Sequence, residues 1–295
     1  MKKKVLLLSI ALFASIALFA QRQETIYYDK NWKGCSQSEA EFFRVVNYDE
    51  NGNIVGKIID YFITGELQAE IENALYIDKV DDSKSKFVGY TAGFYKSGVK
   101  EFETIYDDQG DIVTRKFWYE SGQLREYREG LRSGKTKIWY ESGQLQREFD
   151  YVNGELDGQF LTYWENGNAK RIDEYKNGEF ITGKCFNIDG EEIPYFDYII
   201  LPEFPGGIEV LQYISKEVRY PRYSRRNRIE GRVIVEFAVD IDGSITDINI
   251  FESVSEEIDN ESIRVVNEMP KWIPGKVDGE IAKLRLALPI TFRLR

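Results

Sequence analysis

The sequence predicts a mainly β array of antiparallel hairpins followed by a small α+β domain. Two observations support this class. A motif of aromatic residues and glycine repeats along residues 48–192, and the repeat then gives way to two helical and three strand-like apolar patterns. The length of 295 residues suits roughly two domains of about 150 residues each. We therefore expect a hairpin repeat array, then two helices on a three-stranded antiparallel sheet.

The composition narrows the possible functions. Asp and Glu number 50 against 39 Lys and Arg, and there is no His, so the formal net charge is −11. Without His, the usual general base, the Ser-His-Asp arrangement and most zinc sites are missing. An acidic chain also lacks the excess cations that nucleic-acid phosphates require. We expect no enzyme activity, no cofactor, no metal site, no nucleic-acid partner and no small-molecule substrate.

The first residues have the pattern of an export signal. Lysines at positions 2–4 precede an uninterrupted apolar or small-residue stretch over residues 5–20. This order predicts a secretory signal peptide over residues 1–20. An uncleaved signal anchor is the alternative, although a membrane-spanning helix needs about 20 apolar residues. We expect a periplasmic or cell-envelope protein, with residues 21–47 as a lead-in to the repeats.

The two cysteines, Cys35 and Cys185, would lie in an oxidising compartment after export. A disulfide between them and two unpaired buried thiols are both consistent with the sequence. Neither has a neighbouring Cys or His, so we assign neither a redox nor a catalytic role.

The repeat motif has two aromatic positions, two or three polar residues and a glycine. The stretch WYESGQL occurs twice, and weaker half-motifs between copies place a turn glycine about every 11 to 13 residues. Asn-Gly and Ser-Gly dipeptides favour tight hairpin turns, and short aromatic segments favour half-buried strands. The full copies begin at Tyr61, Phe94, Trp118, Trp139 and Tyr163.

A period of about 23 residues predicts hairpins that stack on their neighbours, because one hairpin cannot bury its own aromatic residues. The aromatic stripe is interpreted as core, and an exposed groove for carbohydrate or peptide is the alternative. Glu120, Glu141 and Glu165 share one repeat position, which indicates solvated turn flanks and not acid-base residues. The repeats resemble the bacterial variant of the MORN-type family, which implies an interaction or membrane-proximal scaffold. The charged run 78–86 is interpreted as an insertion.

Two segments of the C-terminal part have helical apolar spacing. After a linker over residues 193–204, the segment 205–219 is suited to a short helix. A second helix is expected from an N-cap at Asp259 to about Glu268, before Pro270. The arginine-rich stretch between the first helix and the next strand is expected to be a solvated connection. Contact with acidic peptide, peptidoglycan or lipid phosphate is the alternative.

Three segments of residues 205–295 alternate between apolar and polar positions. Residues 233–241 and a returning strand through Ile250 flank Asp242-Gly243, which predicts a hairpin. Residues 283–294 alternate in the same way, which predicts a strand with one buried and one wet face.

These residues resemble the TonB C-terminal domain family over residues 205–292. The resemblance implies a domain that binds the TonB box, an extended peptide of outer-membrane TonB-dependent transporters, through its last strand. The motif residues that carry the resemblance are expected to be mainly structural: Tyr220, Pro221, Gly231, Gly243, Trp272, Pro274 and Gly275.

Residues 283–292 match the pairing strand of that family by position. An edge strand offers unpaired N–H and C=O groups, so an extended peptide can add as another strand. Pro289 cannot donate, which supports an edge position and limits pairing there. An edge blunted against aggregation is the alternative. The predicted partner-binding residues, in which the cations would attract acidic groups, are Lys283, Leu284, Arg285, Leu286, Leu288 and Phe292.

Two features separate the chain from a full energy transducer of that family. Such a protein has a membrane helix with a functional His and a long Pro-rich spacer, whereas this chain has no His and seven Pro. The resemblance therefore implies receptor binding, and it implies inner-membrane proton-channel partners only if residues 1–20 remain as an anchor. The leading hypothesis is a periplasmic TonB-like protein that supports transmembrane transport, with the repeats as scaffold or spacer. The alternative is an envelope scaffold with no part in energised transport.

Overall fold

The computed structural model describes residues 22–207 and 209–294, so the predicted export segment lies outside the described residues. The chain divides into two compact units between residues 194 and 195. The predicted fold class is confirmed: a large antiparallel sheet is followed by a small α+β unit with a three-stranded sheet. None of the helices in the described ranges has both the length and the apolar character needed to cross a membrane.

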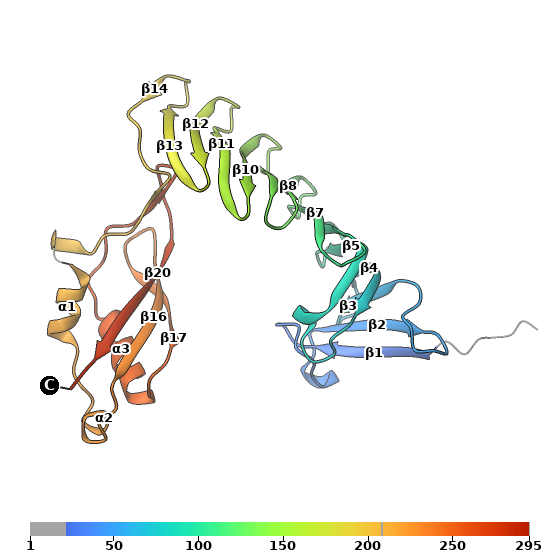
Figure 1. Ribbon diagram of the computed structural model, residues 1–295, viewed down its shortest axis with the longest axis horizontal. Helices are drawn as coiled ribbons and strands as arrows, with labels where there is room; N and C mark the ends of the chain where they lie inside the picture. The colour runs from blue at the N-terminus through green and yellow to red at the C-terminus, as the bar shows by residue number, and fades with distance from the viewer. Residues whose placement is uncertain (1–21, 208, 295) are drawn as a thin grey trace, which may run out of the picture. The chain divides into compact units, whose positions relative to one another are not determined.

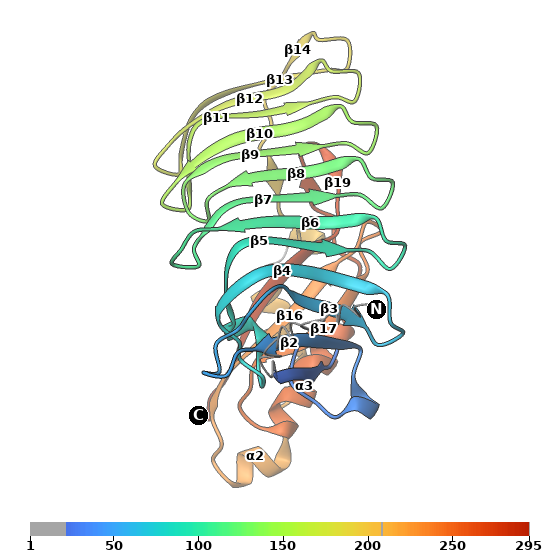
Figure 2. The same ribbon diagram turned by 90° about the vertical axis from the view of Figure 1, so that its right-hand side faces the viewer.

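The first unit is one antiparallel sheet whose fourteen strands follow sequence order, as Figure 2 shows. Each strand pairs with the next one along the chain, as expected for stacked hairpins. The strands are β1 (Arg22–Tyr28), β2 (Phe42–Tyr48), β3 (Ile58–Phe62), β4 (Leu67–Tyr76), β5 (Lys86–Phe94), β6 (Lys100–Tyr106), β7 (Ile112–Trp118), β8 (Leu124–Glu129), β9 (Gly134–Trp139), β10 (Leu145–Val152), β11 (Glu155–Tyr163), β12 (Ala169–Lys176), β13 (Glu179–Phe186) and β14 (Glu192–Ile193).

The sheet begins before the repeats that the sequence indicated. Strand β1 and all of β2 except Tyr48 lie within residues 21–47, which the sequence pattern assigned to a lead-in. A long connection joins these two strands and contains the 3-10 helix η1 (Gln37–Glu39). This connection has no tight turn dipeptide of the kind that marks the later hairpins, so the sequence pattern did not indicate β1 and β2 as a hairpin.

The second aromatic residue of the repeat motif ties each repeat to the next one. Its side chain donates a hydrogen bond to a backbone carbonyl of the following repeat. The donors and acceptors are Tyr95 and Trp118 (2.8 Å), Tyr119 and Trp139 (2.9 Å), Tyr140 and Tyr163 (2.9 Å), and Trp164 and Phe186 (3.1 Å). These aromatic residues are half-buried, so the motif encodes a hydrogen bond between repeats as well as apolar packing.

Removing one of these hydroxyl groups should weaken the array by a modest and measurable amount. We expect Tyr119→Phe to lower the free energy of unfolding of the repeat unit by about 1 kcal/mol, the usual net value of one hydrogen bond. Urea denaturation followed by circular dichroism measures this change. Tyr61→Phe is the matched control, because the Tyr61 hydroxyl makes no hydrogen bond within the described ranges. Equal effects of the two variants would contradict the role of the motif hydroxyl.

The two faces of this sheet carry different cations. Residues paired across strands share a face, and side chains alternate between faces along each strand. The register from β2 to β13 thus places five arginines on one face, here named the Arg face: Arg44, Arg115, Arg128, Arg147 and Arg171. The opposite face carries cross-strand pairs of Lys and Glu: Lys57 with Glu70, Lys116 with Glu103, and Lys137 with Glu148.

The N-terminal strands pack against the loop between β4 and β5. This loop contains η2 (Asp82–Lys84) and includes most of the charged run that the sequence indicated as an insertion. The Gly34 N–H donates to the Val80 carbonyl at 2.9 Å, and the Asp82 N–H donates to the Trp32 carbonyl at 3.1 Å. A small core lies beneath, formed by Ile26, Tyr28, Val46, Ile58, Ile71, Ala74 and Ile77. The array thus has a specialised first end, which stacked repeats generally need.

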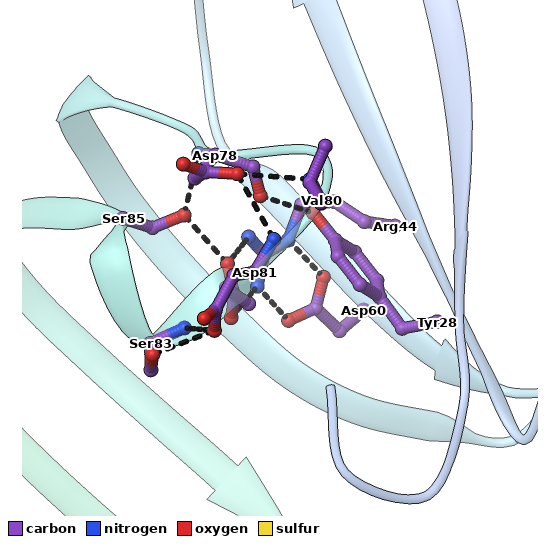
Figure 3. Close-up of polar contacts among 9 residues, drawn as sticks. Tyr28, Arg44, Asp60, Asp78, Val80, Asp81, Ser83 and Ser85 are labelled. Atoms are coloured by element: carbon purple, nitrogen blue, oxygen red, sulfur yellow. Dashed lines mark hydrogen bonds and ion pairs between the residues drawn. The ribbon is translucent and has the colours of Figure 1, made fainter. Parts of the chain in front are cut away.

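Arg44 joins this loop to the sheet, and Figure 3 shows the surrounding contacts. Its guanidinium donates two bonds to Asp60, at 2.7 and 2.8 Å, and two to Asp82, at 2.6 and 3.1 Å. The Arg44 side chain is 1% exposed, and it lies over the rings of Tyr28, Trp32 and Phe87. Burial lowers the pKa of Arg44, but the two carboxylates outweigh burial and raise it above its usual value.

The second unit is built around a three-stranded antiparallel sheet of order β17-β16-β20 (Figure 1). Its strands are β16 (Gly231–Val239), β17 (Ile245–Glu252) and β20 (Leu284–Phe292). Its helices are α1 (Val210–Glu217), α2 (Arg222–Arg226) and α3 (Glu256–Asn267). A second small sheet joins β15 (Ile199–Ile200), from the predicted linker, to β18 (Lys276–Val277) and β19 (Glu280–Ile281).

Two local expectations for the helices are corrected. The N-cap of α3 is Ser255, whose side chain accepts a bond from the Ile258 N–H, and Asp259 lies inside the first turn. Asp259 instead accepts from the Val254 N–H, which holds the chain that enters the helix. The arginine-rich stretch expected to be a connection forms the five-residue helix α2. Its N-cap is Pro221, whose carbonyl accepts a hydrogen bond from the Arg225 N–H at 2.9 Å.

Candidate functional site

The candidate site is the outer edge of β20. Every residue of β20 pairs with β16, from Leu284 opposite Val239 to Phe292 opposite Gly231. In the part of the chain that the structure describes, no strand pairs with the other edge of β20. The edge therefore offers unpaired backbone groups to a partner, as an edge strand does in peptide recognition by strand addition.

The core of the unit fixes the position of β20. Its inward side chains Leu288, Ile290 and Phe292 are 7%, 1% and 1% exposed, and they pack with the inward side chains of β16 and with α3. Alternate residues point outward and are exposed, from Arg285 to Thr291. The apolar and polar alternation that the sequence showed is therefore the alternation of a half-buried strand.

Pro289 indicates which backbone groups face outward. It lies opposite Ile234 in the middle of the ladder, and a proline within a sheet has its nitrogen away from the pairing partner. The direction of the backbone N–H and C=O groups alternates along a strand. We therefore infer that these groups point to the open edge at Arg285, Ala287, Pro289 and Thr291. Leu286 and Leu288 then pair with β16. The open edge has donors at residues 285, 287 and 291, and lacks one at 289.

The structure divides the predicted partner-binding residues into two groups. Leu288 and Phe292 belong to the buried core, so their side chains cannot contact a peptide at the edge. Leu284 and Leu286 are half-buried and point the same way. The inward side chains hold β20 against the core of the unit, while the outward residues are exposed. Partner binding along residues 283–292 stays a prediction.

The two cations of the predicted site are paired within the sheet. Lys283 contacts Asp247 at 3.0 Å and Asp240 at 3.6 Å, and Arg285 contacts Asp247 at 3.2 Å. Asp247 lies at an irregularity of the β16–β17 pairing with a φ of 52°, which directs it toward these cations. The hydrogen bond from Lys283 is the main cause that lowers the pKa of Asp247. Acidic residues of a partner would have to compete with Asp247.

The remaining motif residues hold the domain together. The Tyr220 hydroxyl donates to the Ile229 carbonyl at 2.6 Å, and its ring meets Phe292 edge-on at 5.6 Å. Gly243 has a φ of 82°, and a Cβ at this position would lie 2.1 Å from the Trp272 carbonyl oxygen. Trp272 is 7% exposed and packs against Phe237.

Glycines at two other motif positions allow close approach of the chain. A Cβ at Gly231 would lie 2.6 Å from the Val254 side chain, and one at Gly275 would lie 2.6 Å from the Ile200 carbonyl oxygen. Pro221 caps α2, and Pro274 is half-buried beside Gly275. The contacts of all these motif residues are with other parts of the same unit.

Outside this unit, Cys35 and Cys185 are not joined by a disulfide in the structure. Glu120, Glu141 and Glu165 are exposed at turns, one in each of three repeats. They lie on separate hairpins.

Comparison with known proteins agrees with both parts of this description. Residues 216–294 match the family described as Gram-negative bacterial TonB protein C-terminal. Residues 132–153 and 156–177 each match the MORN repeat variant.

Individual relatives match the second unit. The proteins named "Protein TonB" from two strains of Helicobacter pylori, J99 and 26695, are 32% and 30% identical over 82 and 83 residues. The match covers 28% of this chain and 28% of each relative. Two NMR solution structures of the Helicobacter pylori TonB-CTD match with 23% and 27% identity and TM-scores of 0.25 and 0.23. They cover 31% and 28% of this chain, and 89% and 88% of the solved chains. The chain therefore carries a TonB C-terminal domain at its C-terminal end and MORN-variant repeats before it.

Proposed function

We propose that the chain is an envelope protein whose C-terminal unit binds outer-membrane transporters by strand addition along β20. The observation that carries this proposal is the open edge of β20, held in a domain of the TonB C-terminal type. In such a complex the outward N–H and C=O groups of residues 285, 287 and 291 pair with an extended peptide of the transporter, the TonB box. Binding needs no chemical step, so the proposed protein is not an enzyme.

The repeat sheet is proposed to act as a scaffold or spacer. Its repeats are linked through hydrogen bonds from one hairpin to the next. The sheet can therefore act as a continuous spacer without a helix or a Pro-rich segment. Export through residues 1–20 and a periplasmic location belong to the same proposal. An inner-membrane proton-channel partner would be added if those residues stay as an anchor.

The open edge can be tested with a proline at an outward position. We expect Ala287→Pro to reduce the affinity for a TonB-box peptide at least about tenfold, because it removes an edge donor that the partner strand needs. Proline at Leu286 would be less informative, since that backbone pairs with β16 and its loss would unfold the sheet. Titration of the full chain with plug peptides of candidate transporters, followed by backbone amide shifts, measures the affinity.

Ala287→Val is the matched control, because it changes the same exposed side chain and keeps the N–H. It should bind the peptide as the unchanged chain does. The melting temperatures of both variants show whether the unit remains folded. Unchanged affinity of a folded Ala287→Pro variant would reject the edge as the site. Absence of binding across the whole peptide panel by the unchanged chain would favour the envelope scaffold without a role in energised transport.

A further inference from the structure

A cavity of about 460 Å³ lies on the Arg face of the repeat sheet, over β3 to β7. It exists because small side chains occupy positions where neighbouring strands carry large ones. Along one cross-strand row, Ala69 and Gly93 lie between Asp60 and Phe102. A Cβ at Gly93 would lie 2.1 Å from the Phe102 ring, so this ring lies against the bare backbone of β5 and forms part of the cavity wall.

The rest of the wall is largely aromatic. Trp32, Phe87, Phe102, Tyr106 and Phe117 line the cavity. Phe87 meets Tyr106 edge-on, with ring centroids 6.3 Å apart, and the Phe102 and Phe117 rings are 6.4 Å apart. The volume falls within the range of roughly 300–1,000 Å³ that small-molecule sites have.

Two buried polar atoms in the cavity wall make no hydrogen bond. They are the Oε1 atom of Gln68, in a side chain that is 9% exposed, and the Oγ1 atom of Thr91, in one that is 4% exposed. Gln68 lies at an irregularity of the β3–β4 pairing, where Tyr61 is opposite Leu67 and Asp60 opposite Ala69. A buried polar group without a partner is costly. Both atoms have almost no accessible surface, so a ligand whose hydroxyl or amide groups satisfy them has to displace the atoms that cover them.

The cavity also holds an open positive charge. Arg115 lines it, and its Nε donates to the Thr104 hydroxyl at 3.3 Å. Within residues 22–207 and 209–294, Arg115 has no ion pair with a carboxylate. The other charges of the wall are already matched: all four carboxylate oxygens of Asp60 and Asp82 accept from Arg44. The two terminal nitrogens of Arg115 thus remain for an anion, which a guanidinium can hold in a bidentate pair.

We propose that this cavity binds an acidic saccharide, a pyranose ring that carries a carboxylate. The carboxylate pairs with Arg115, hydroxyl or acetamido groups bond to Gln68 and Thr91, and the apolar face of the ring lies against Phe102 and Phe117. A ligand of this kind satisfies each unmatched feature of the cavity. The site belongs to the first unit, whereas β20 belongs to the second, and it would give the repeat sheet a binding function of its own.

The probe for this site is D-glucuronate, titrated into the full chain while the backbone amide shifts of β4 to β7 are followed. We expect saturable shifts with glucuronate, and an affinity for D-glucose that is about tenfold weaker or less, because glucose lacks the carboxylate. N-acetylglutamate amide, an acidic peptide fragment without the sugar ring, should also bind more weakly. Tighter binding of the glutamate derivative would indicate that the cavity prefers an acidic peptide to a saccharide, and it would overturn the proposal.

Two variants locate the site. Arg115→Gln should weaken glucuronate binding about tenfold or more, whereas Lys116→Gln should leave it unchanged. Lys116 is the adjacent residue, points to the opposite face and pairs with Glu103 at 2.9 Å, so the two substitutions change the net charge equally. Equal loss in both variants, or no saturable shift with glucuronate, would reject the site.

A filling variant gives a second test that does not depend on charge. Ala69→Leu places a larger side chain into the hollow and should abolish the glucuronate shifts while the urea midpoint of the unit changes little. If Ala69→Leu does not fold, Thr91→Val removes one orphan hydroxyl with little change in volume and should weaken binding. Retained binding in the folded variant would overturn the proposal. Peptide binding at β20 is measured on the other unit, so a failure here leaves the proposed function untouched.

Discussion

Replacing Arg44 with methionine is expected to destabilise the repeat unit by about 3–5 kcal/mol, the usual cost of removing one partner of a buried ion pair. The substitution leaves two carboxylates without their cation, and the side chain of Asp60 is only 2% exposed. It also removes the guanidinium that lies over the Tyr28, Trp32 and Phe87 rings. Urea denaturation, followed by the circular dichroism of the sheet, measures the change in the free energy of unfolding.

A nearby surface pair provides the control for this effect. Lys57 and Glu70 are 2.8 Å apart, which is close to the Arg44–Asp60 distance, but the Lys57 side chain is 63% exposed. Lys57→Met should therefore cost far less stability than Arg44→Met, because water screens an exposed pair. The double variant Arg44→Met, Asp60→Leu should recover part of the lost stability, since no unpaired charge remains on Asp60. Similar losses from Arg44→Met and Lys57→Met would contradict the structural role of Arg44.

The Arg44 cluster also shows where sequence reasoning reached its limit. Arg44, Asp60 and Asp82 are separated by 16 and 22 residues and belong to β2, β3 and the loop after β4. Asp82 lies in a charged run that a sequence can only assign to a solvated insertion, because charge runs usually are solvated. The register of β2 on β3 and the return of the loop over β1 bring the three together. Neither the strand register nor the path of the loop can be recognised from a short stretch of sequence.

The repeats and the C-terminal strands were predictable because their signals are local. A turn dipeptide after a short aromatic segment specifies a hairpin by itself, and strict alternation specifies the buried face of β16 and β20. The same local rules failed for β1 and β2, whose connection is long, and for α2, whose arginines gave no apolar period. They also misplaced the helix cap: Ser255 and Asp259 are both good N-cap residues, and the structure uses Ser255.

The position of strand β20 was predictable, but the details of its edge were not. Alternation along residues 283–294 identified an exposed and a buried face, but the open edge depends on which strands pair, and that is a property of the assembled sheet. The pairing of Lys283 and Arg285 with Asp247 depends on an irregularity in β17 that the sequence does not mark. The cavity near Arg115 is a similar case: Ala69 and Gly93 are small residues in different strands, and only the register makes them neighbours.

Phe237→Ala is expected to produce the largest loss of stability in the C-terminal unit, about 3–5 kcal/mol, as a buried Phe typically does when truncated. Phe237 is fully buried on the central strand β16, opposite Leu286 of β20, and its ring meets Trp272 at 5.6 Å. The cavity left behind would lie between β20 and the segment that carries Trp272. Since β16 is the strand that pairs with β20, the variant should also lose affinity for an edge-binding peptide.

The neighbouring strand offers a matched control for this variant. Phe251 in β17 is 70% exposed, so Phe251→Ala removes the same side chain from water and should change the unfolding free energy by no more than about 0.5 kcal/mol. Thermal unfolding of the full chain should show the Phe237→Ala shift in the transition of the second unit, with the repeat unit unaffected, because the two units have separate cores. A loss below about 1 kcal/mol for Phe237→Ala would mean that the sheet relaxes into the cavity, and the rigid presentation of the β20 edge would then have to come from its backbone pairing with β16 alone.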